Sequence, residues 1–336
     1  MTKKHALKEL DKYKTVLNIP GVEKYLIPKP HFCKPSDTAT FREFFSHCQN
    51  KKLQNPDAKL RLLILEDGGI SLENVVMLLP KMSAVDFKLF VCSWGKIIDA
   101  VCFLAKHKII HHDLKLGNIV YNVQTGDLKF IDFGKVTTMS NFVLISSDNQ
   151  NNEGTSWFNY PVETQCANKS DFLEKGDCAV FRDSMEYDAF IRKAAMTFDM
   201  YSIGLVFKEL VELIFKFHEL TENPIFQEVP MAFFQDCKKL GEKMSDPELK
   251  KRVFSPCKFQ ESFAKICKTH QLTCSAPNKL STALVKKLET VEHVICRGRK
   301  KTWNPFTNKC VKKCAKGFYR KKVNTRKFKC VKGFKN

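Results

Sequence analysis

Long apolar runs and a secretory leader are both missing from this 336-residue sequence. No stretch approaches the length that crosses a bilayer, and the N-terminus, MTKKHALKELDKYK, has no apolar core. A membrane span and a secretory signal are therefore not expected, and the default location is intracellular, in the cytoplasm or nucleus. Because 43% of the residues are hydrophobic, wholesale disorder is excluded as well.

Acidic residues are missing from the end of the chain. Residues 296–336 hold 16 Lys or Arg and no Asp or Glu, so this tail carries most of the net charge of +20. Aromatic residues lie between the basic ones, which suits binding to nucleic acid, to an anionic membrane surface or to an acidic protein. A solvated basic tail is the alternative. We interpret residues 291–336 as a separate basic module.

Paired cysteine spacing is also missing over most of the chain. The ten cysteines before residue 275 lie scattered, which predicts buried free thiols in a reducing compartment. In the tail, Cys310 and Cys314 have the spacing of half a zinc site, which Cys296 and Cys330 could complete. Two disulfides or four free thiols are the alternatives there.

The hydrophobic pattern predicts many helices and few strands. The expected helices span residues 1–20, 86–107 and 198–217, with further helical segments between 225 and 290. The expected strands span residues 59–65, 119–122 and 128–131, and the last two form a hairpin. Residues 135–160 are polar, and we expect a mobile loop there.

The stretch HHDLKLGNIVYNVQTGDLKFIDFG, residues 111–134, gathers polar groups around the predicted hairpin. Asp113, Lys115 and Asn118 precede the hairpin and Asp132 follows it, so these side chains can converge at its mouth. Two carboxylates and an amide oxygen suit Mg²⁺, and a lysine adds positive charge beside a transferred phosphoryl group. An ordinary polar hairpin is the alternative.

The spacing of these residues resembles that of protein kinases. His111, Asp113 and Asn118 fit the pattern H-x-D-x-x-x-x-N, and residues 132–134 are D-F-G. The resemblance implies ATP and Mg²⁺ as cofactors. It also implies a protein substrate with a Ser or Thr hydroxyl, because a lysine two residues after the aspartate is usual in serine/threonine kinases.

The resemblance also implies a role for each residue of this stretch. Asp113 would orient the substrate hydroxyl and accept its proton, and Lys115 would contact the γ-phosphate. Asn118 and Asp132 would hold the metal ion. Asp132, Phe133 and Gly134 together would form part of the nucleotide site.

Residues 63–69, LILEDGG, resemble the kinase hinge that hydrogen-bonds adenine through its backbone. Glu66, Asp67 and Gly68 are accordingly candidate nucleotide-binding residues. The continuation GGISLE is similar to the hinge of haspin-type kinases. A strand that ends in a glycine turn is the alternative.

Three further residues have expected structural roles. Asp199 in FDMYSIG resembles the aspartate of D-x-W-S-x-G, which would brace the loop that carries Asp113. Glu163 in YPVE resembles the end of A-P-E and would pair with an arginine of the large lobe. Glu9 is the candidate ion-pair glutamate of the small lobe.

The segment NYPVE is similar to the divergent serine/threonine kinases of large DNA viruses. This likeness implies a location in the host cytoplasm or nucleus, or in a virion.

Two kinase features are missing from the sequence. The roughly 65 residues before the hinge contain no G-x-G-x-x-G and no V-A-I-K-like strand, and His112 stands where kinases usually have arginine. The start of the full kinase could lie upstream, the enzyme could hold ATP without a lid, or the chain could be a pseudokinase that serves as a binding scaffold. His112 would not support strong activation by loop phosphorylation.

We therefore expect an α+β, protein-kinase-like fold. Residues 1–69 would form a reduced N-lobe with the hinge, residues 70–290 a mostly helical C-lobe, and residues 291–336 the basic cysteine-containing module. The expected function is phosphoryl transfer from ATP to protein hydroxyls, and a pseudokinase-type scaffold is the alternative. The oligomeric state is left open.

Overall fold

The computed structural model describes the greater part of the chain before residue 275 and four short segments of the tail. The described ranges are 3–27, 30–33, 62–151, 160–220, 224–253, 255–274, 301–304, 309–312, 318–324 and 327–332. Up to Ile64 these ranges hold helix α1 (Lys3–Leu17), a short 3₁₀ turn, and an antiparallel strand pair. That pair consists of β1 (His31–Cys33) and β2 (Leu62–Ile64).

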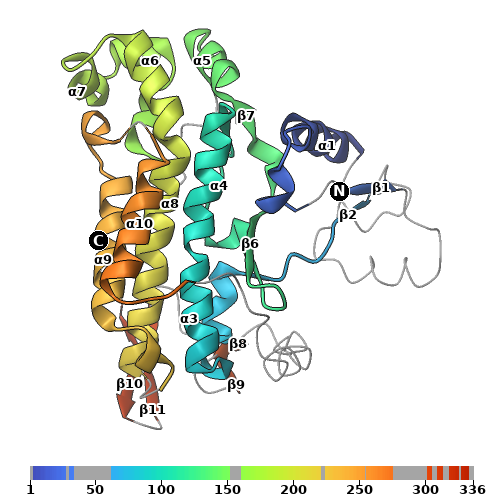
Figure 1. Ribbon diagram of the computed structural model, residues 1–336. Helices are drawn as coiled ribbons and strands as arrows, with labels where there is room; N and C mark the ends of the chain where they lie inside the picture. The colour runs from blue at the N-terminus through green and yellow to red at the C-terminus, as the bar shows by residue number, and fades with distance from the viewer. Residues whose placement is uncertain are drawn as a thin grey trace.

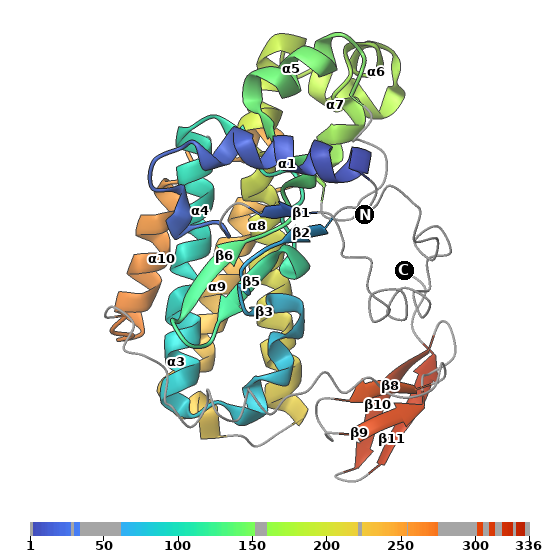
Figure 2. The same ribbon diagram turned by 90° about the vertical axis from the view of Figure 1, so that its right-hand side faces the viewer.

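Helices make up most of the described residues between 70 and 274, and the long ones form a bundle in which α3 and α4 follow one another end to end beside α8, α9 and α10 (Figure 1). They are α3 (Ala84–Ser93), α4 (Gly95–Lys106), α8 (Tyr187–Leu220), α9 (Met231–Met244) and α10 (Lys258–Thr269). The short helices α5 (Met139–Ser147), α6 (Lys169–Glu174) and α7 (Ala179–Arg182) cluster at one end of this bundle (Figure 2). Short 3₁₀ turns connect several of these helices. Within the described ranges, no helix is long and apolar enough to cross a membrane.

A small antiparallel sheet begins directly after the hinge and lies against the helix bundle. Its order is β3–β5–β6, with β3 at Ile70–Ser71, β5 at Ile119–Asn122 and β6 at Asp127–Phe130. A second pair joins β4 (Ile109–Ile110) to β7 (Thr137–Thr138). The predicted hairpin is therefore present, and its second strand begins one residue earlier than expected.

Two hairpins make up the described part of the tail. Strands β8 (Lys301–Asn304) and β9 (Lys309–Lys312) form one, and β10 (Phe318–Asn324) and β11 (Lys327–Lys332) form the other. Cys310 lies on β9 and Cys330 on β11, whereas Cys296 and Cys314 fall outside the described residues. The proposed metal or disulfide pairing of these cysteines stays a prediction.

Two sequence-based element predictions were wrong. The helix expected at 86–107 is broken at Trp94, whose N–H bonds the Val91 carbonyl in a tighter turn before α4 begins at Gly95. The polar stretch expected to be a loop contains β7 and α5. Helix α5 is capped by the Thr138 hydroxyl, which accepts from the Asn141 N–H, and it buries Phe142.

The close crossing of α8 and α9 depends on two glycines. A Cβ at Gly204 would lie 2.6 Å from the Gly241 carbonyl oxygen, and a Cβ at Gly241 would lie 2.7 Å from the Gly204 carbonyl oxygen. Only residues without a Cβ allow this backbone contact. From Met200 to Phe217, α8 contributes buried apolar residues to the main core, whereas its residues from Tyr187 to Phe198 pack in a second cluster with α5, α6 and α7.

The expectation of unpaired thiols was wrong for six cysteines. Disulfides join Cys92 to Cys274, Cys102 to Cys257, and Cys166 to Cys178. Cys33, Cys237 and Cys267 are free. Spacing along the chain did not reveal the pairs because two of them join residues 182 and 155 positions apart. Disulfides are typical of oxidising environments, so the expected intracellular location loses the support that it drew from cysteine usage.

A buried ion pair fastens the segment before α6 to the turn before α10. Glu163 is 0% exposed, and both of its carboxylate oxygens accept from the guanidinium of Arg252, one of them at 3.0 Å. Arg252 also donates to the Asp246 carbonyl at 2.6 Å and lies over the Tyr201 ring. Arg252 is thus the arginine that the sequence alone did not identify.

We predict that Arg252→Ala lowers the free energy of unfolding by about 3–5 kcal/mol, because it leaves the Glu163 carboxylate buried without its partner. Urea unfolding followed by circular dichroism measures this change. Lys251→Ala is the matched control, since Lys251 pairs with Glu248 on the surface and its loss should change stability little. Equal effects of the two substitutions would contradict the assignment.

Candidate active site

The polar residues that follow β4 form one hydrogen-bonded group. The Asp113 carboxylate oxygen Oδ2 accepts from Lys115 Nζ at 3.0 Å and from Asn118 Nδ2 at 3.0 Å. Asn118 Nδ2 also donates to the Asp113 carbonyl at 2.8 Å. Asp113 is 8% exposed and Asn118 is 6% exposed. The structure therefore brings together the three residues that were predicted to act together.

The hairpin places Asp132 at the same end of the sheet. Ile119 is in register with Phe130 across β5 and β6, and the Ile131 N–H donates to the Asn118 carbonyl at 3.0 Å. Asp132 follows directly, with a left-handed φ of 64° and one carboxylate oxygen accepting from the Gly134 N–H. Its side chain is exposed. The carboxylate is thus available at the open mouth of the hairpin, as the sequence predicted.

The donor set at this mouth fits a hard divalent cation. The Asn118 amide nitrogen faces Asp113, which leaves the amide oxygen as an acceptor, and the Asp132 carboxylate is exposed. Mg²⁺ prefers such oxygen ligands and keeps waters and phosphate oxygens in its other positions. In the described ranges no cluster of three or more His, Cys, Asp or Glu could hold a metal by itself.

Asp199 on α8 holds the backbone of the loop that carries Asp113. Its two carboxylate oxygens accept from the His111 N–H at 2.6 Å and from the His112 N–H at 3.0 Å. His112 has a left-handed φ of 70°, so two successive N–H groups meet one carboxylate. Burial raises the pKa of Asp199 to about 6, and these two hydrogen bonds oppose the rise.

Three rings connect α1 to this loop. The Phe133 ring packs against Tyr13 of α1 at 4.8 Å and against His111 at 5.1 Å between ring centroids. His111 also contacts the Ile131 carbonyl through Nε2 at 3.1 Å. On the same helix, Lys12 Nζ donates to the Val136 carbonyl at 2.7 Å. Helix α1 is therefore docked on the turn that carries Asp132.

Glu9 lies one turn before Tyr13 on α1 and is half-buried. Burial raises its pKa, and the negative charge of Asp132 raises it further. Its carboxylate is thus on the side of the helix that faces the site. Among the described residues, no lysine or arginine forms an ion pair with Glu9, so its role as an ion-pair glutamate stays a prediction.

His112 lies in a buried aromatic cluster. Its ring stacks on Tyr160, with centroids 5.4 Å apart, and meets Phe198 at 4.4 Å. Burial lowers its pKa to about 3, and the nearby positive charge of Lys135 adds to this. Lys135 Nζ donates to the Tyr160 hydroxyl at 2.8 Å. The imidazole is therefore neutral at physiological pH and does not offer the positive charge of the usual arginine.

The proposed hinge is a turn between β2 and β3. Glu66 and Asp67 are exposed, and Asp67 Oδ1 accepts from the Gly69 N–H at 2.9 Å. A Cβ at Gly68 would meet the Ile27 and Val120 side chains at 2.6 Å. Gly69 has a φ of 100°, and a Cβ there would lie 2.1 Å from the Tyr121 carbonyl oxygen. The turn therefore requires glycine and lies against two apolar side chains.

Sequence reasoning missed several residues that build the site. Tyr13 contacts Phe133 and Val120 lies against Gly68 of the hinge, yet neither was singled out as a site residue. Lys12 and Tyr160 were also missed, and they contact residues next to the predicted ones. One signal was present for Tyr13, because it lies four residues after Glu9 and so shares its helix face. The contacts of Lys12 and Tyr160 depend on distant segments and leave no local signal.

Comparisons with known proteins agree with this geometry. Residues 67–171 match the family model described as the protein kinase domain. The chain is also 40% identical over 73 residues to a protein of Dictyostelium discoideum named "Probable serine/threonine-protein kinase mps1". That match covers 22% of this chain and spans 7% of the relative's length. Both comparisons support the protein kinase superfamily for the segment that holds the site.

Proposed function

We propose that this protein transfers the γ-phosphate of ATP to a Ser or Thr hydroxyl of a protein substrate. The observation that carries the proposal is the contact of Asp113 with both Lys115 and Asn118, with Asp132 at the same mouth of the hairpin. Phosphoryl transfer needs little covalent chemistry from the protein and depends mainly on positioning and on charge stabilisation. This group supplies a base, a cation and metal ligands in one place.

Each residue of the group has a task in this proposal. Asp113 orients the substrate hydroxyl and takes its proton, while Asn118 holds the carboxylate in place from one side. Lys115 adds positive charge where the transferred phosphoryl group becomes most negative. Asn118 and Asp132 would hold Mg²⁺, which neutralises phosphate charge when it is bound with ATP.

The hinge offers a site for the adenine ring. Ile27 and Val120 are buried apolar side chains beneath Gly68. A flat ring would lie beside this turn, and the backbone of residues 66–68 would hydrogen-bond its edge. Phe133 and Gly134 belong to the nucleotide site through Asp132, since they form the turn that follows it.

Activity in this proposal does not depend on phosphorylation of the segment after Asp132. The neutral His112 ring, stacked on Tyr160, does not supply the positive charge with which the usual arginine would pair such a phosphate. The Lys135–Tyr160 hydrogen bond holds the end of that segment without any modification.

A non-catalytic scaffold is the second candidate. Glu9 pairs with no lysine among the described residues, and the sequence contains no glycine-rich loop before the hinge. The basic tail, residues 296–336, would then deliver the fold to nucleic acid or to an acidic surface.

The likeness to viral and haspin-type kinases and the intracellular location also stay predictions.

We predict that Asp113→Asn lowers phosphoryl transfer at least about 100-fold, because the amide cannot accept the substrate proton. The assay measures transfer of labelled phosphate from ATP to a basic test protein in the presence of Mg²⁺. Asp127→Asn is the matched control, since Asp127 lies at the far end of the same hairpin and pairs with Lys96. Absence of label with the wild-type chain, or equal label in Asp113→Asn, would favour the scaffold.

We also predict that transfer falls reversibly as the pH drops through about 6. Protonated Asp199 is a weaker acceptor for the His111 and His112 N–H groups than the carboxylate, so the brace on the loop weakens. The pKa of Asp199 is raised in the folded chain, so protonation there favours the folded state, and stability from this group increases as the pH falls. The loss should therefore appear in a rate–pH profile without a lower melting temperature.

The histidines do not account for this transition, since the pKa of His111 is lowered to about 4 and that of His112 to about 3. Asp199→Asn should remove the acidic limb of the profile and lower the plateau. An unchanged limb in that variant would assign the transition to another group.

A further inference from the structure

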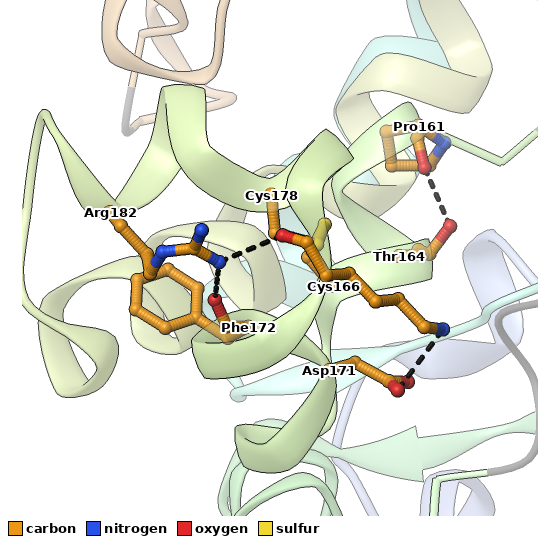
Figure 3. The surroundings of a disulfide bond; sticks show 8 residues. Pro161, Thr164, Cys166, Asp171, Phe172, Cys178 and Arg182 are labelled. Atoms are coloured by element: carbon orange, nitrogen blue, oxygen red, sulfur yellow. Dashed lines mark hydrogen bonds and ion pairs between the residues drawn. A yellow bond between two sulfur atoms is a disulfide. The ribbon is translucent and has the colours of Figure 1, made fainter.

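A disulfide closes a short loop at the edge of the proposed site. Cys166 ends a 3₁₀ turn (Val162–Cys166), and Cys178 lies 12 residues later, directly before α7. Both are buried, at 2% and 0% exposure. We call residues 166–178 the disulfide loop. Figure 3 shows the bond with the side chains around it.

Hydrogen bonds make the disulfide loop compact. The Arg182 guanidinium donates to the Phe172 carbonyl and to the Lys175 carbonyl, the latter at 2.8 Å, and Lys175 pairs with Asp171 at 3.0 Å (Figure 3). Phe172 is buried against Tyr187 and Phe190 of α8. The loop therefore has a fixed shape that is anchored on the longest helix.

The disulfide loop holds the chain that leaves α5. Asn168 Oδ1 accepts from the Asn151 N–H at 3.0 Å, and Asn168 Nδ2 donates to the Asn151 carbonyl at 3.0 Å. The Ser170 N–H donates to Asn149 Oδ1 at 2.8 Å. Both main-chain groups of Asn151 are thus bound by one side chain of the loop.

The disulfide loop also continues directly from the chain that returns to the site. Thr164 donates to the Pro161 carbonyl through its hydroxyl at 2.6 Å (Figure 3). The neighbouring Glu163 is paired with Arg252, and Tyr160 stacks on His112, next to Asp113. The two flanks, residues 149–151 and 160–164, therefore share one support, and one of them reaches the Asp113 loop.

We infer that the Cys166–Cys178 disulfide positions these two flanks for binding of the protein substrate. The inference rests on the proposed function. The cysteines touch no reacting group, so they are positioning residues and act through Asn168 and Thr164. Val162 lies between Tyr160 and Glu163 in the sequence, and its side chain is 51% exposed. The flank therefore presents an apolar contact to a polypeptide. ATP binding should not depend on the bond, because the hinge and Asp132 lie on other elements.

The chemistry makes substrate binding sensitive to reduction. A dithiol that reduces the bond leaves two thiols at Cys166 and Cys178 and is itself oxidised to a disulfide. The reduced chain then holds residues 149–151 through hydrogen bonds, and residues 160–164 through the Glu163–Arg252 pair and the stacking of Tyr160, with no covalent closure of the disulfide loop. The oxidised form is accordingly the form that binds a protein substrate best.

The double variant Cys166→Ser/Cys178→Ser tests the inference. We expect KM for the protein substrate to rise at least about fivefold, with kcat and KM for ATP within about twofold of wild type. The matched control is Cys102→Ser/Cys257→Ser, which removes a disulfide between α4 and the residue before α10. The control should lower the melting temperature without raising KM. Asn168→Ala, which keeps the bond and breaks its link to Asn151, should raise KM as well and serves if the double variant does not fold.

A second readout separates this inference from the proposed function. Amide hydrogen exchange should become faster at residues 149–151 in both the double variant and Asn168→Ala, and at residues 160–164 in the double variant, and stay unchanged at 109–132. This measurement needs no phosphoryl transfer, so a wild-type chain without activity overturns the proposed function while exchange still decides the inference. Unchanged exchange at the flanks, the same KM rise in the control, or free thiols at Cys166 and Cys178 in the wild-type chain would overturn the inference.

Discussion

The site depends on one carboxylate that is not part of the chemistry. Asp199 is buried on α8 and accepts two successive N–H groups from the loop that carries Asp113. Burial of a carboxylate is costly unless such donors satisfy it, so the loop and the helix fix each other. The two hydrogen bonds allow His112 to hold a left-handed conformation. They also orient Asp113 toward Lys115 and Asn118. Without that brace, the loop would be held on the bundle by side-chain packing alone, such as that of the His112 ring on Phe198.

Packing of aromatic rings, and not ion pairs, attaches α1 and Tyr160 to the loop that Asp199 braces. Phe133 lies between His111 and Tyr13, and the His112 ring lies between Tyr160 and Phe198. A neutral, buried imidazole replaces a charged side chain here, and aromatic contacts replace the ion pair that such a charge would make. The junction between α8 and the chain on either side of α5 is therefore formed by packed, uncharged rings and does not depend on an ion pair.

Local features of the site could be predicted from the sequence, and long-range ones could not. The contact of Asp113, Lys115 and Asn118 follows from spacing within one loop, and the hairpin follows from alternating apolar residues around a glycine turn. Arg252 lies 89 residues from Glu163, and no local pattern marks it. Helix α5 was missed because its Ser and Asn content is typical of loops, while its stability comes from the Thr138 cap and the burial of Phe142. The two long-range cysteine pairs were missed for the same reason as Arg252, since only the folded chain brings them together.

The two disulfides between cysteines far apart in the sequence constrain the order of events while the chain is synthesised and folds. Cys92 and Cys102 leave the ribosome well before their partners, which lie 182 and 155 residues further along the chain. During that interval the two early thiols are ten residues apart and have only each other, or other early cysteines, as neighbours. Correct cross-linking therefore waits until the chain has been made as far as Cys274 and α10 has docked on α4. A cell that makes this protein must either keep its thiols reduced through synthesis or repair wrong pairs afterwards.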